Sequence, residues 1–404
     1  MKRRYWLIMR IVLLASLATL TFVSSYAANA AVPVTIVPIK PITPVIPVTP
    51  SPPPSQPATA PAPVYNGKVL WKFVSRKNIS PPLVAPDGSV YATVEDPDQN
   101  NEVGTGLYAF TGAGKMKWMA PITHPGSKEF NPRMAIGIDG TVYLGDSDGI
   151  LHAISPSNGA EKWSFRVGEA FTAAPVIGQD GTIFITTGSQ LIAITAAGKK
   201  KLSFSVSNVA LAPAIGKDGT IYVGDATYLT IYNANGTLKR KVNLVGTMAA
   251  SPPVLASDKL YMIRKDMSYR TTLGAYKLDG TWMYDIRPSG LEPQDTPVLS
   301  AGGTLLYVTS DRDLYAIRVA DLTVAWKYSF ASGIRSSPVL GPNSTVVSRS
   351  KYSHVAVLDA ATGKTKWMAE WPYNQYSLPS VSKDGTVYIS DSGTLYAIGI
   401  PKSN

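Results

Sequence analysis

The segment LDAATGKTKW (residues 358–367) places a glycine, Gly363, four residues before a tryptophan, Trp367. The same spacing occurs at Gly67 and Trp71, Gly114 and Trp118, and Gly159 and Trp163. Four further copies fill the tryptophan position with Leu202, Arg240, Tyr284 and Trp326, the last of them without the glycine. Because five of the eight tryptophans share one repeated position, the chain is built from internal repeats.

Two other signals recur with this position in a fixed order. One is a turn followed by a β-branched strand that ends in an aromatic residue, and the other is a strand of the type Leu-aromatic-Ala-Ile, as in residues 314–317. The turns begin at Asp87, Asp139, Asp180, Asp218, Asp258, Gly303, Asn343 and Asp384. A period near 40 made of short strands and tight turns is typical of a four-stranded propeller blade, and no segment shows helical periodicity.

The order of the signals predicts how the ring closes. A tryptophan strand at residues 67–73 precedes the first turn, and the last blade ends at Ile398 without one. The N-terminal strand is therefore expected to complete the last blade, which removes the open sheet edge of a linear stack. Residues 66–400 are predicted to form an all-β, eight-bladed propeller of four-stranded antiparallel blades.

The first 65 residues have a different composition. Residues 1–30 have a basic start, an apolar stretch at 11–23 and a small-residue cleavage site at Ala28-Asn29-Ala30, which predicts a signal peptide; the alternative is an uncleaved membrane anchor. Twelve prolines follow in residues 31–65, which excludes helix and sheet and predicts an extended linker, either a stalk or an inert spacer. We therefore expect an extracytoplasmic protein: secreted, periplasmic or on the cell surface.

Composition excludes several classes of site. The chain has no cysteine, so it has no disulfide, thiolate metal site, cysteine nucleophile or lipid-modified N-terminal cysteine, and it has only three histidines. The net charge is +11, but five of the cations lie before residue 66 and the others are spread along the chain. This pattern lacks the clustered basic stripe of nucleic-acid-binding proteins, so no nucleic-acid partner is expected.

The segment 358–367 resembles the tryptophan-docking repeat of the pyrroloquinoline quinone (PQQ)-like propeller family, and 154–163 and 317–326 are looser copies. The resemblance covers residues 66–400 and implies an eight-bladed propeller. The family includes quinoprotein alcohol and glucose dehydrogenases and a periplasmic scaffold of outer-membrane β-barrel assembly. The dehydrogenases bind Ca²⁺ through a Glu/Asn/Asp set and use an Asp base, but no segment here matches the motifs that carry those residues.

Few residues stand out as candidate sites. The acidic stretch 96–102 begins like a calcium loop but lacks its glycine and its final glutamate, so it is interpreted as a hairpin loop. Residues 146–149, 311–313 and 391–393 are predicted hairpin turns, and His152 takes a position that tyrosine fills in other repeats, which predicts a packing role. The aromatic stretch with Trp371, Tyr373 and Tyr376 is a weak candidate for binding.

The sequence thus predicts no catalytic, cofactor or metal residues. The favoured function is an exported, monomeric, non-catalytic propeller that binds a protein or a cell-envelope polymer through its loops and channel mouth. It would touch a membrane only through an uncleaved N-terminal segment. A PQQ-dependent dehydrogenase or its relic is one alternative, and an envelope sensor or outer-membrane assembly factor-like scaffold is another.

Overall fold

The computed structural model describes residues 66–75, 78–95, 105–122, 133–146, 148–206, 211–334, 336–351, 354–370, 377–391 and 393–400. All of them belong to the unit Pro61–Asn404. The predicted signal peptide and linker, residues 1–65, lie outside the described residues. The described residues form strands and turns without a helix.

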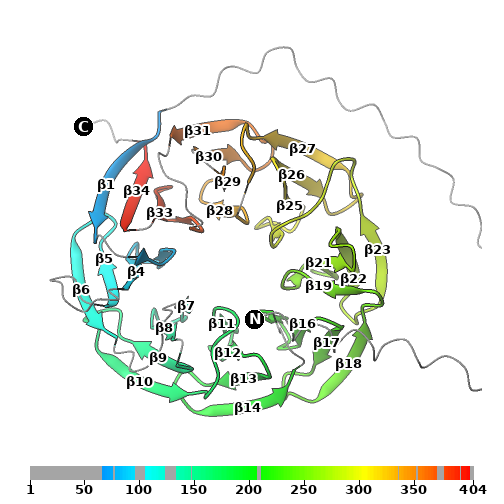
Figure 1. Cartoon of the computed structure of the whole chain (residues 1–404), viewed down its shortest axis with the longest axis horizontal. Helices are drawn as coiled ribbons and strands as arrows, with labels where there is room; N and C mark the ends of the chain where they lie inside the picture. Colours follow the sequence, from blue (N-terminus) through cyan, green and yellow to red (C-terminus); the bar gives the residue numbers. More distant parts are fainter. Residues whose placement is uncertain are drawn as a thin grey trace, which may run out of the picture. The chain divides into compact units, whose positions relative to one another are not determined.

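The strands form eight antiparallel sheets that stand around a ring, an eight-bladed β-propeller (Figure 1). Blade 1 contains β2 (Asn78–Ile79), β3 (Leu83–Val84), β4 (Val90–Glu95), β5 (Gly106–Phe110) and β6 (Met116–Pro121). Blade 2 contains β7 (Arg133–Ile136), β8 (Val142–Gly145), β9 (Ile150–Ile154) and β10 (Glu161–Arg166). Blade 3 contains β11 (Val176–Ile177), β12 (Ile183–Thr186), β13 (Gln190–Ile194) and β14 (Lys200–Ser205). Blade 4 contains β15 (Ala214–Ile215), β16 (Ile221–Gly224), β17 (Tyr228–Tyr232) and β18 (Leu238–Asn243).

The other four blades follow the same plan. Blade 5 contains β19 (Thr247–Ala249), β20 (Val254–Leu255), β21 (Lys259–Asp266), β22 (Thr271–Lys277) and β23 (Trp282–Ile286). Blade 6 contains β24 (Val298–Leu299), β25 (Leu305–Ser310), β26 (Asp313–Arg318) and β27 (Val324–Ser329). Blade 7 contains β28 (Val339–Gly341), β29 (Thr345–Arg349), β30 (His354–Asp359) and β31 (Thr365–Glu370). Blade 8 contains β32 (Ser380–Val381), β33 (Val387–Ser390), β34 (Thr394–Gly399) and β1 (Lys68–Val74).

The ring closes as the order of the sequence signals predicts. β1 pairs antiparallel with β34, with Trp71 opposite Ala397 and Phe73 opposite Leu395. Figure 1 shows the blue first strand beside the red last one. The two ends of the propeller chain therefore share one sheet, and blade 8 has no open outer edge at β34.

The repeated tryptophan position is one structural position. In each blade a bulge in the outer strand puts this residue opposite the third strand, as Trp163 lies opposite Ala153 and Trp326 opposite Ala316. Leu202, Arg240 and Tyr284 take the same register opposite Ala193, Ile231 and Ala275. The blade backbone is thus retained even where the tryptophan is not.

Each of the five tryptophans packs on a glycine of the next blade. A Cβ added to Gly363 would lie 2.6 Å from the Trp326 ring, and the indole Nε1 donates a hydrogen bond to Ala360 O at 3.1 Å. Gly363 has φ +71°, a conformation that glycine adopts without steric cost. The other pairs are Trp71 with Gly114, Trp118 with Gly159, Trp163 with Gly198, and Trp367 with Gly67.

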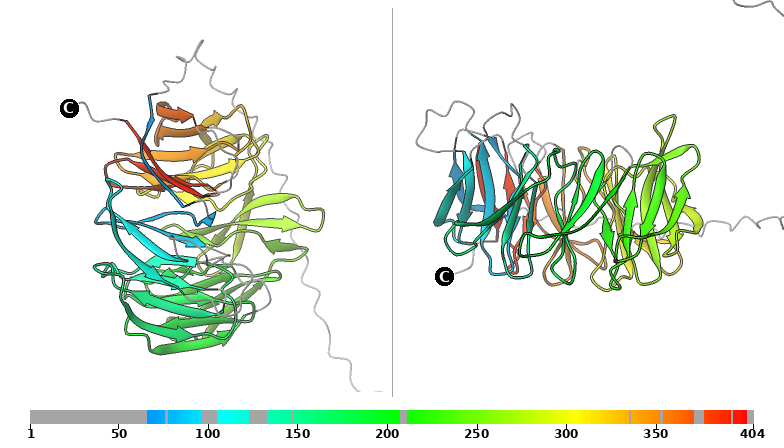
Figure 2. Two further views of the ribbon diagram at one scale, coloured as in Figure 1. Left: turned by 60° about the vertical axis from the view of Figure 1, so that its left-hand side comes forward. Right: turned by 90° about the horizontal axis from the view of Figure 1, so that it is seen from below.

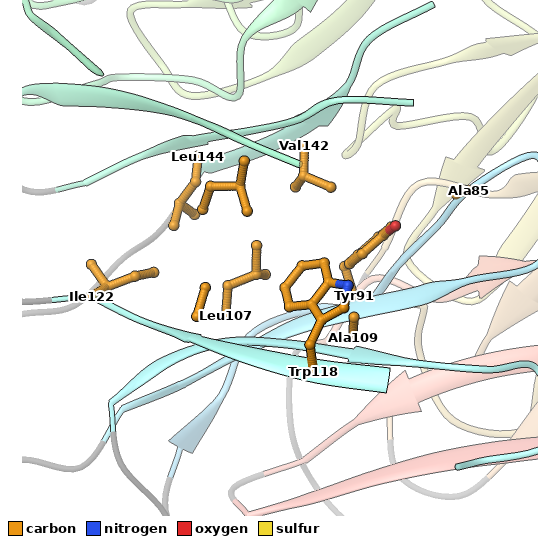
Figure 3. Close-up of a cluster of buried hydrophobic side chains, with 10 residues drawn as sticks. Ala85, Tyr91, Leu107, Ala109, Trp118, Ile122, Val142 and Leu144 are labelled. Atoms are coloured by element: carbon orange, nitrogen blue, oxygen red, sulfur yellow. The ribbon is translucent and has the colours of Figure 1, made fainter. Parts of the chain in front are cut away.

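The core lies between blades. In the cluster of Figure 3, Trp118, Tyr91 and Leu107 of blade 1 contact Val142 and Leu144 of blade 2, and all five are buried. The Trp118 and Tyr91 ring centroids are 5.7 Å apart. In four blades the aromatic residue that ends the turn–strand signal pairs in this way with the tryptophan of its own blade: Tyr91 with Trp118, Tyr143 with Trp163, Tyr307 with Trp326 and Tyr388 with Trp71.

Candidate functional site

The propeller has two faces that differ in construction. Because neighbouring strands are antiparallel, the hairpins between first and second strands and between third and fourth strands share one face, here the turn face. The connections between second and third strands, and those between blades, share the opposite loop face. The side view in Figure 2 shows these two sets of connections on opposite sides of the ring.

The turn face is made of short hairpins that use their own polar groups. Asp139 accepts hydrogen bonds from Thr141 N and Oγ1 at 3.0 and 2.7 Å, and equivalent bonds join Asp180 to Thr182. Lys201 on the outer strand adds an ion pair at 2.9 Å, and its hydrogen bond lowers the pKa of Asp180 to about 2, with the Thr182 bonds acting in the same direction. These carboxylates therefore stabilise turns.

Buried aspartates close three of the hairpins of the loop face, those that contain Asp146, Asp225 and Asp391. Asp225 Oδ1 accepts bonds from Thr227 N and Tyr228 N, both at 2.7 Å, and Asp391 Oδ1 accepts one from Thr394 N at 3.0 Å. The predicted turns at 146–149, 311–313 and 391–393 are confirmed, since they join β8 to β9, β25 to β26 and β33 to β34. The carboxylates of Asp146, Asp225 and Asp391 thus accept hydrogen bonds from backbone amides of their own hairpins.

His152 contacts two carboxylates through its two ring nitrogens. It follows Leu151 at the predicted tyrosine-like position, opposite Leu144 and Ser164. Its Nδ1 lies 2.6 Å from Glu161 Oε2 and its Nε2 lies 3.1 Å from Asp146 Oδ2. Burial lowers the pKa of His152, but the hydrogen bonds to the two carboxylates outweigh burial, so the pKa is raised. The imidazole ring thus joins two carboxylates within blade 2.

The predicted binding residues Trp371, Tyr373 and Tyr376 lie outside the described residues, between β31 and β32 in the chain. The acidic stretch 96–102, between β4 and β5, and His124 lie outside them as well. Within the described ranges, no group of three His, Asp or Glu side chains is placed to hold a metal ion. No helix among those residues is long and apolar enough to cross a membrane.

The structure shows an exposed cluster of apolar side chains that the repeat pattern does not predict. Val245, Met267 and Tyr269 are 79%, 79% and 78% exposed, and they lie in adjacent loops because Thr247 pairs with Asp266. Residues 199–287, which include these loops, carry thirteen Lys and Arg against six Asp. The available signal was the interval of 45 residues between the turns at Asp258 and Gly303, longer than those beside it.

Comparison with family models identifies the family to which the repeats belong. The model described as "Outer membrane protein assembly factor BamB", built on the PQQ-type repeat, matches residues 64–242 and 280–401. The chain belongs to this PQQ-repeat family. The match omits residues 243–279, which contain Val245, Met267 and Tyr269. The resemblance noted at residues 358–367 is confirmed.

Solved structures share the fold of this PQQ-repeat chain. The crystal structure of BamB from Moraxella catarrhalis has a TM-score of 0.57 at 14% identity and covers 84% of this chain and 99% of its own. The crystal structure of the computationally designed Ika8 protein has a TM-score of 0.65 at 11% identity and covers 80% of this chain and 96% of its own. A search of curated protein sequences finds no match.

Proposed function

We propose that this protein is a non-catalytic scaffold of the cell envelope that binds a protein partner through its loop face. The observation that carries the proposal is the match to the BamB family over most of the propeller. The matching family model and one of the similar solved structures are named for BamB, and the model's description is that of an outer-membrane assembly factor. This chain would have a role of the same kind outside the cytoplasm.

The loop face suits partner binding better than the turn face. On the turn face, the hairpins between first and second strands repeat one design in which the aspartate is bonded within its own turn, so these hairpins differ little from blade to blade. The loop face contains connections of varied length and exposes apolar side chains such as Leu378 and Met248. Apolar and arginine side chains on an individual surface are the usual anchors of protein interfaces.

Site-directed cross-linking tests the scaffold function, because a chain without cysteine accepts single reactive thiols. Leu378→Cys and Arg312→Cys place the thiol on the loop face, and the matched controls Ala361→Cys and Ala234→Cys place it on the turn face. With a thiol-reactive photo-cross-linker in intact cells of the source organism, we expect one specific protein adduct from the loop-face variants. Adducts from the turn face alone, or none from any variant, would contradict the proposal.

Catalysis has a separate assay. Purified protein mixed with PQQ and Ca²⁺ is expected to show no alcohol- or sugar-dependent dye reduction. Substrate-dependent reduction above the level of a heat-denatured sample would replace the scaffold with a dehydrogenase.

A further inference from the structure

The β21–β22 hairpin of blade 5 departs furthest from the repeat. β21 has eight residues and β22 has seven, whereas the second and third strands of the other blades have four to six. β19 pairs with the extended end of β21, with Met248 opposite Lys265. Figure 2 shows this lime-coloured hairpin reaching beyond the neighbouring blades. We call residues 245–248 and 265–270 the blade-5 knob.

The knob presents apolar side chains outward from an unfavourable backbone. Val245 has φ +23° and Tyr269 has φ +64°, although glycine takes positive φ at sixteen other described positions. Positive φ is disfavoured for bulky side chains, above all for a β-branched one. Both residues and Met267 are more than three-quarters exposed, so packing within the fold does not explain them. Such strain directs attention to a function at the tip.

Four backbone N–H groups at the tip of the hairpin are hydrogen-bonded within the tip itself. Asp266 N donates to Arg270 O and Tyr269 N donates to Asp266 O, both at 2.9 Å. The Asp266 carboxylate also accepts bonds from Ser268 N at 2.8 Å and Arg270 N at 2.9 Å. An unpaired N–H group is costly in an apolar medium. These four amides are already paired, so moving the tip into such a medium leaves none of them unsatisfied.

Cations surround the apolar tip. The Lys265 ammonium lies 4.4 Å from the centre of the Tyr269 ring, and the side chains of Arg270 and Arg287 are 79% and 70% exposed. Arg287 follows the strand end at which Ile286 pairs with Leu273, so it lies at the same end of the blade. The two acids here are each held by arginine, Asp266 by Arg270 and Asp285 by Arg264 and Arg287. The local charge is therefore positive.

We propose that the blade-5 knob is a membrane-surface contact that inserts Val245, Met267 and Tyr269 among the headgroups of an anionic bilayer. Lys265, Arg270 and Arg287 would bind lipid phosphates around it, as in other surface-bound segments with apolar and basic parts. The charge complementarity favours this occupant. Three protruding side chains also offer far less than the roughly 800 Å² that a stable protein interface takes from each partner. This contact goes beyond the scaffold function and does not depend on it.

A local probe tests the contact in the full chain. Met267→Cys is labelled with the environment-sensitive fluorophore NBD, and Ala361→Cys, on the turn face, is the matched control. Vesicles contain phosphatidylcholine with or without phosphatidylserine. We expect a blue shift and a severalfold rise in emission at position 267 only with phosphatidylserine, reversed by high salt and absent at position 361. Adding Lys265→Gln and Arg270→Gln should weaken partitioning by about fivefold for each cation removed.

The same measurement can overturn the proposal. An unchanged spectrum at position 267 with anionic vesicles, or equal shifts at positions 267 and 361, would exclude a specific membrane contact. A shift at position 267 that requires envelope protein extract instead of lipid would identify the knob as a protein-docking site. Loss of the loop-face cross-link with the lipid response retained would remove the scaffold function and leave this contact standing.

Discussion

Two parts of the ring solve the same packing problem differently. Five blade interfaces have a tryptophan on a glycine, whereas the three consecutive interfaces from blade 3 to blade 6 have Leu202, Arg240 and Tyr284 at that position. Other contacts occur at these interfaces: the Phe204 and Tyr232 ring centroids are 3.9 Å apart, and Tyr284 and Leu322 both pack against one buried cluster. The register is therefore set by the blade backbone, and the indole adds stability to it.

The part of the ring without these tryptophans also carries the excess of basic residues. Residues 199–287 hold the excess of basic residues, and the family match stops within them, at 243–279. The tryptophan-bearing part follows the repeat closely. This contrast suggests a division between blades that hold the ring and blades that carry features particular to this chain.

Removing the closing strand should have the largest effect. Deleting residues 65–75 takes away β1, exposes the outer edge of β34, and removes Trp71 from its contacts with Tyr388 and Gly114. We expect the cooperative unfolding transition to disappear in calorimetry, because both neighbours of blade 8 lose contacts. The control deletes residues 31–64 and should leave the transition in place. A full-height, unshifted transition in the first deletion would refute ring closure as a source of stability.

The tryptophan position comes next. Trp326→Ala should lower the free energy of unfolding by about 3–5 kcal/mol, since it leaves a cavity against Gly363 and removes the indole hydrogen bond to Ala360 O, which keeps the bond from the Tyr307 hydroxyl. Trp282, in the other part of the ring, lies two residues from its blade's tryptophan position and is 53% exposed. Trp282→Ala should cost about 1 kcal/mol or less. Denaturant titration measures both losses. The reverse ranking would show that the tryptophan–glycine contact does not account for the difference between the two parts of the ring.

The fold could be predicted because the sequence signals that specify a blade occur eight times. Asp-Gly turns, β-branched strands and the Gly-to-Trp spacing occur often enough that degenerate copies such as Asn343 could be placed by their neighbours. Even Leu202 and Arg240 could be aligned, although a leucine or arginine alone indicates nothing about a blade interface.

The candidate site could not be predicted in the same way. Val245 lies in a different loop from Met267 and Tyr269 and becomes their neighbour only because β19 pairs with the end of β21. The exposure of these side chains depends on how far each loop extends from the ring, which the periodicity of the sequence does not predict. The sequence aligns His152 with the tyrosines of other repeats, but its contact with Glu161 arises from pairing between β9 and β10.

A pair of glycine substitutions tests the tryptophan–glycine contact from the glycine. Gly363→Ala puts a methyl group 2.6 Å from the Trp326 ring at φ +71°, and we expect a loss of about 2–4 kcal/mol from strain and displacement of the ring. Gly88→Ala is the matched control, with φ +84° and open space around the added carbon, so about 1–2 kcal/mol of strain should remain. Equal losses in thermal or chemical unfolding would mean that the indole adapts freely.

The smallest effect concerns the polar contact of His152 in the tryptophan-bearing part. The pKa of His152 is raised in the folded protein above the unfolded value of about 6.5. Its stabilising contribution is therefore fully present below that pH and is lost as pH rises through the folded pKa. The difference in unfolding free energy between wild type and His152→Gln should accordingly be larger in acid than in mild base. Chemical denaturation across this range measures it.

Glu161→Gln separates the two carboxylates that hold the imidazole. Glu161 is half-exposed and Asp146 is buried, so the variant should reduce the pH-dependent part of the stability without removing it, because the bond from Asp146 remains. A pH dependence identical to that of wild type would assign the raised pKa to Asp146 alone. A difference between wild type and His152→Gln that grows with rising pH would contradict the sign of the shift and leave His152 with the packing role that its tyrosine-like position suggests.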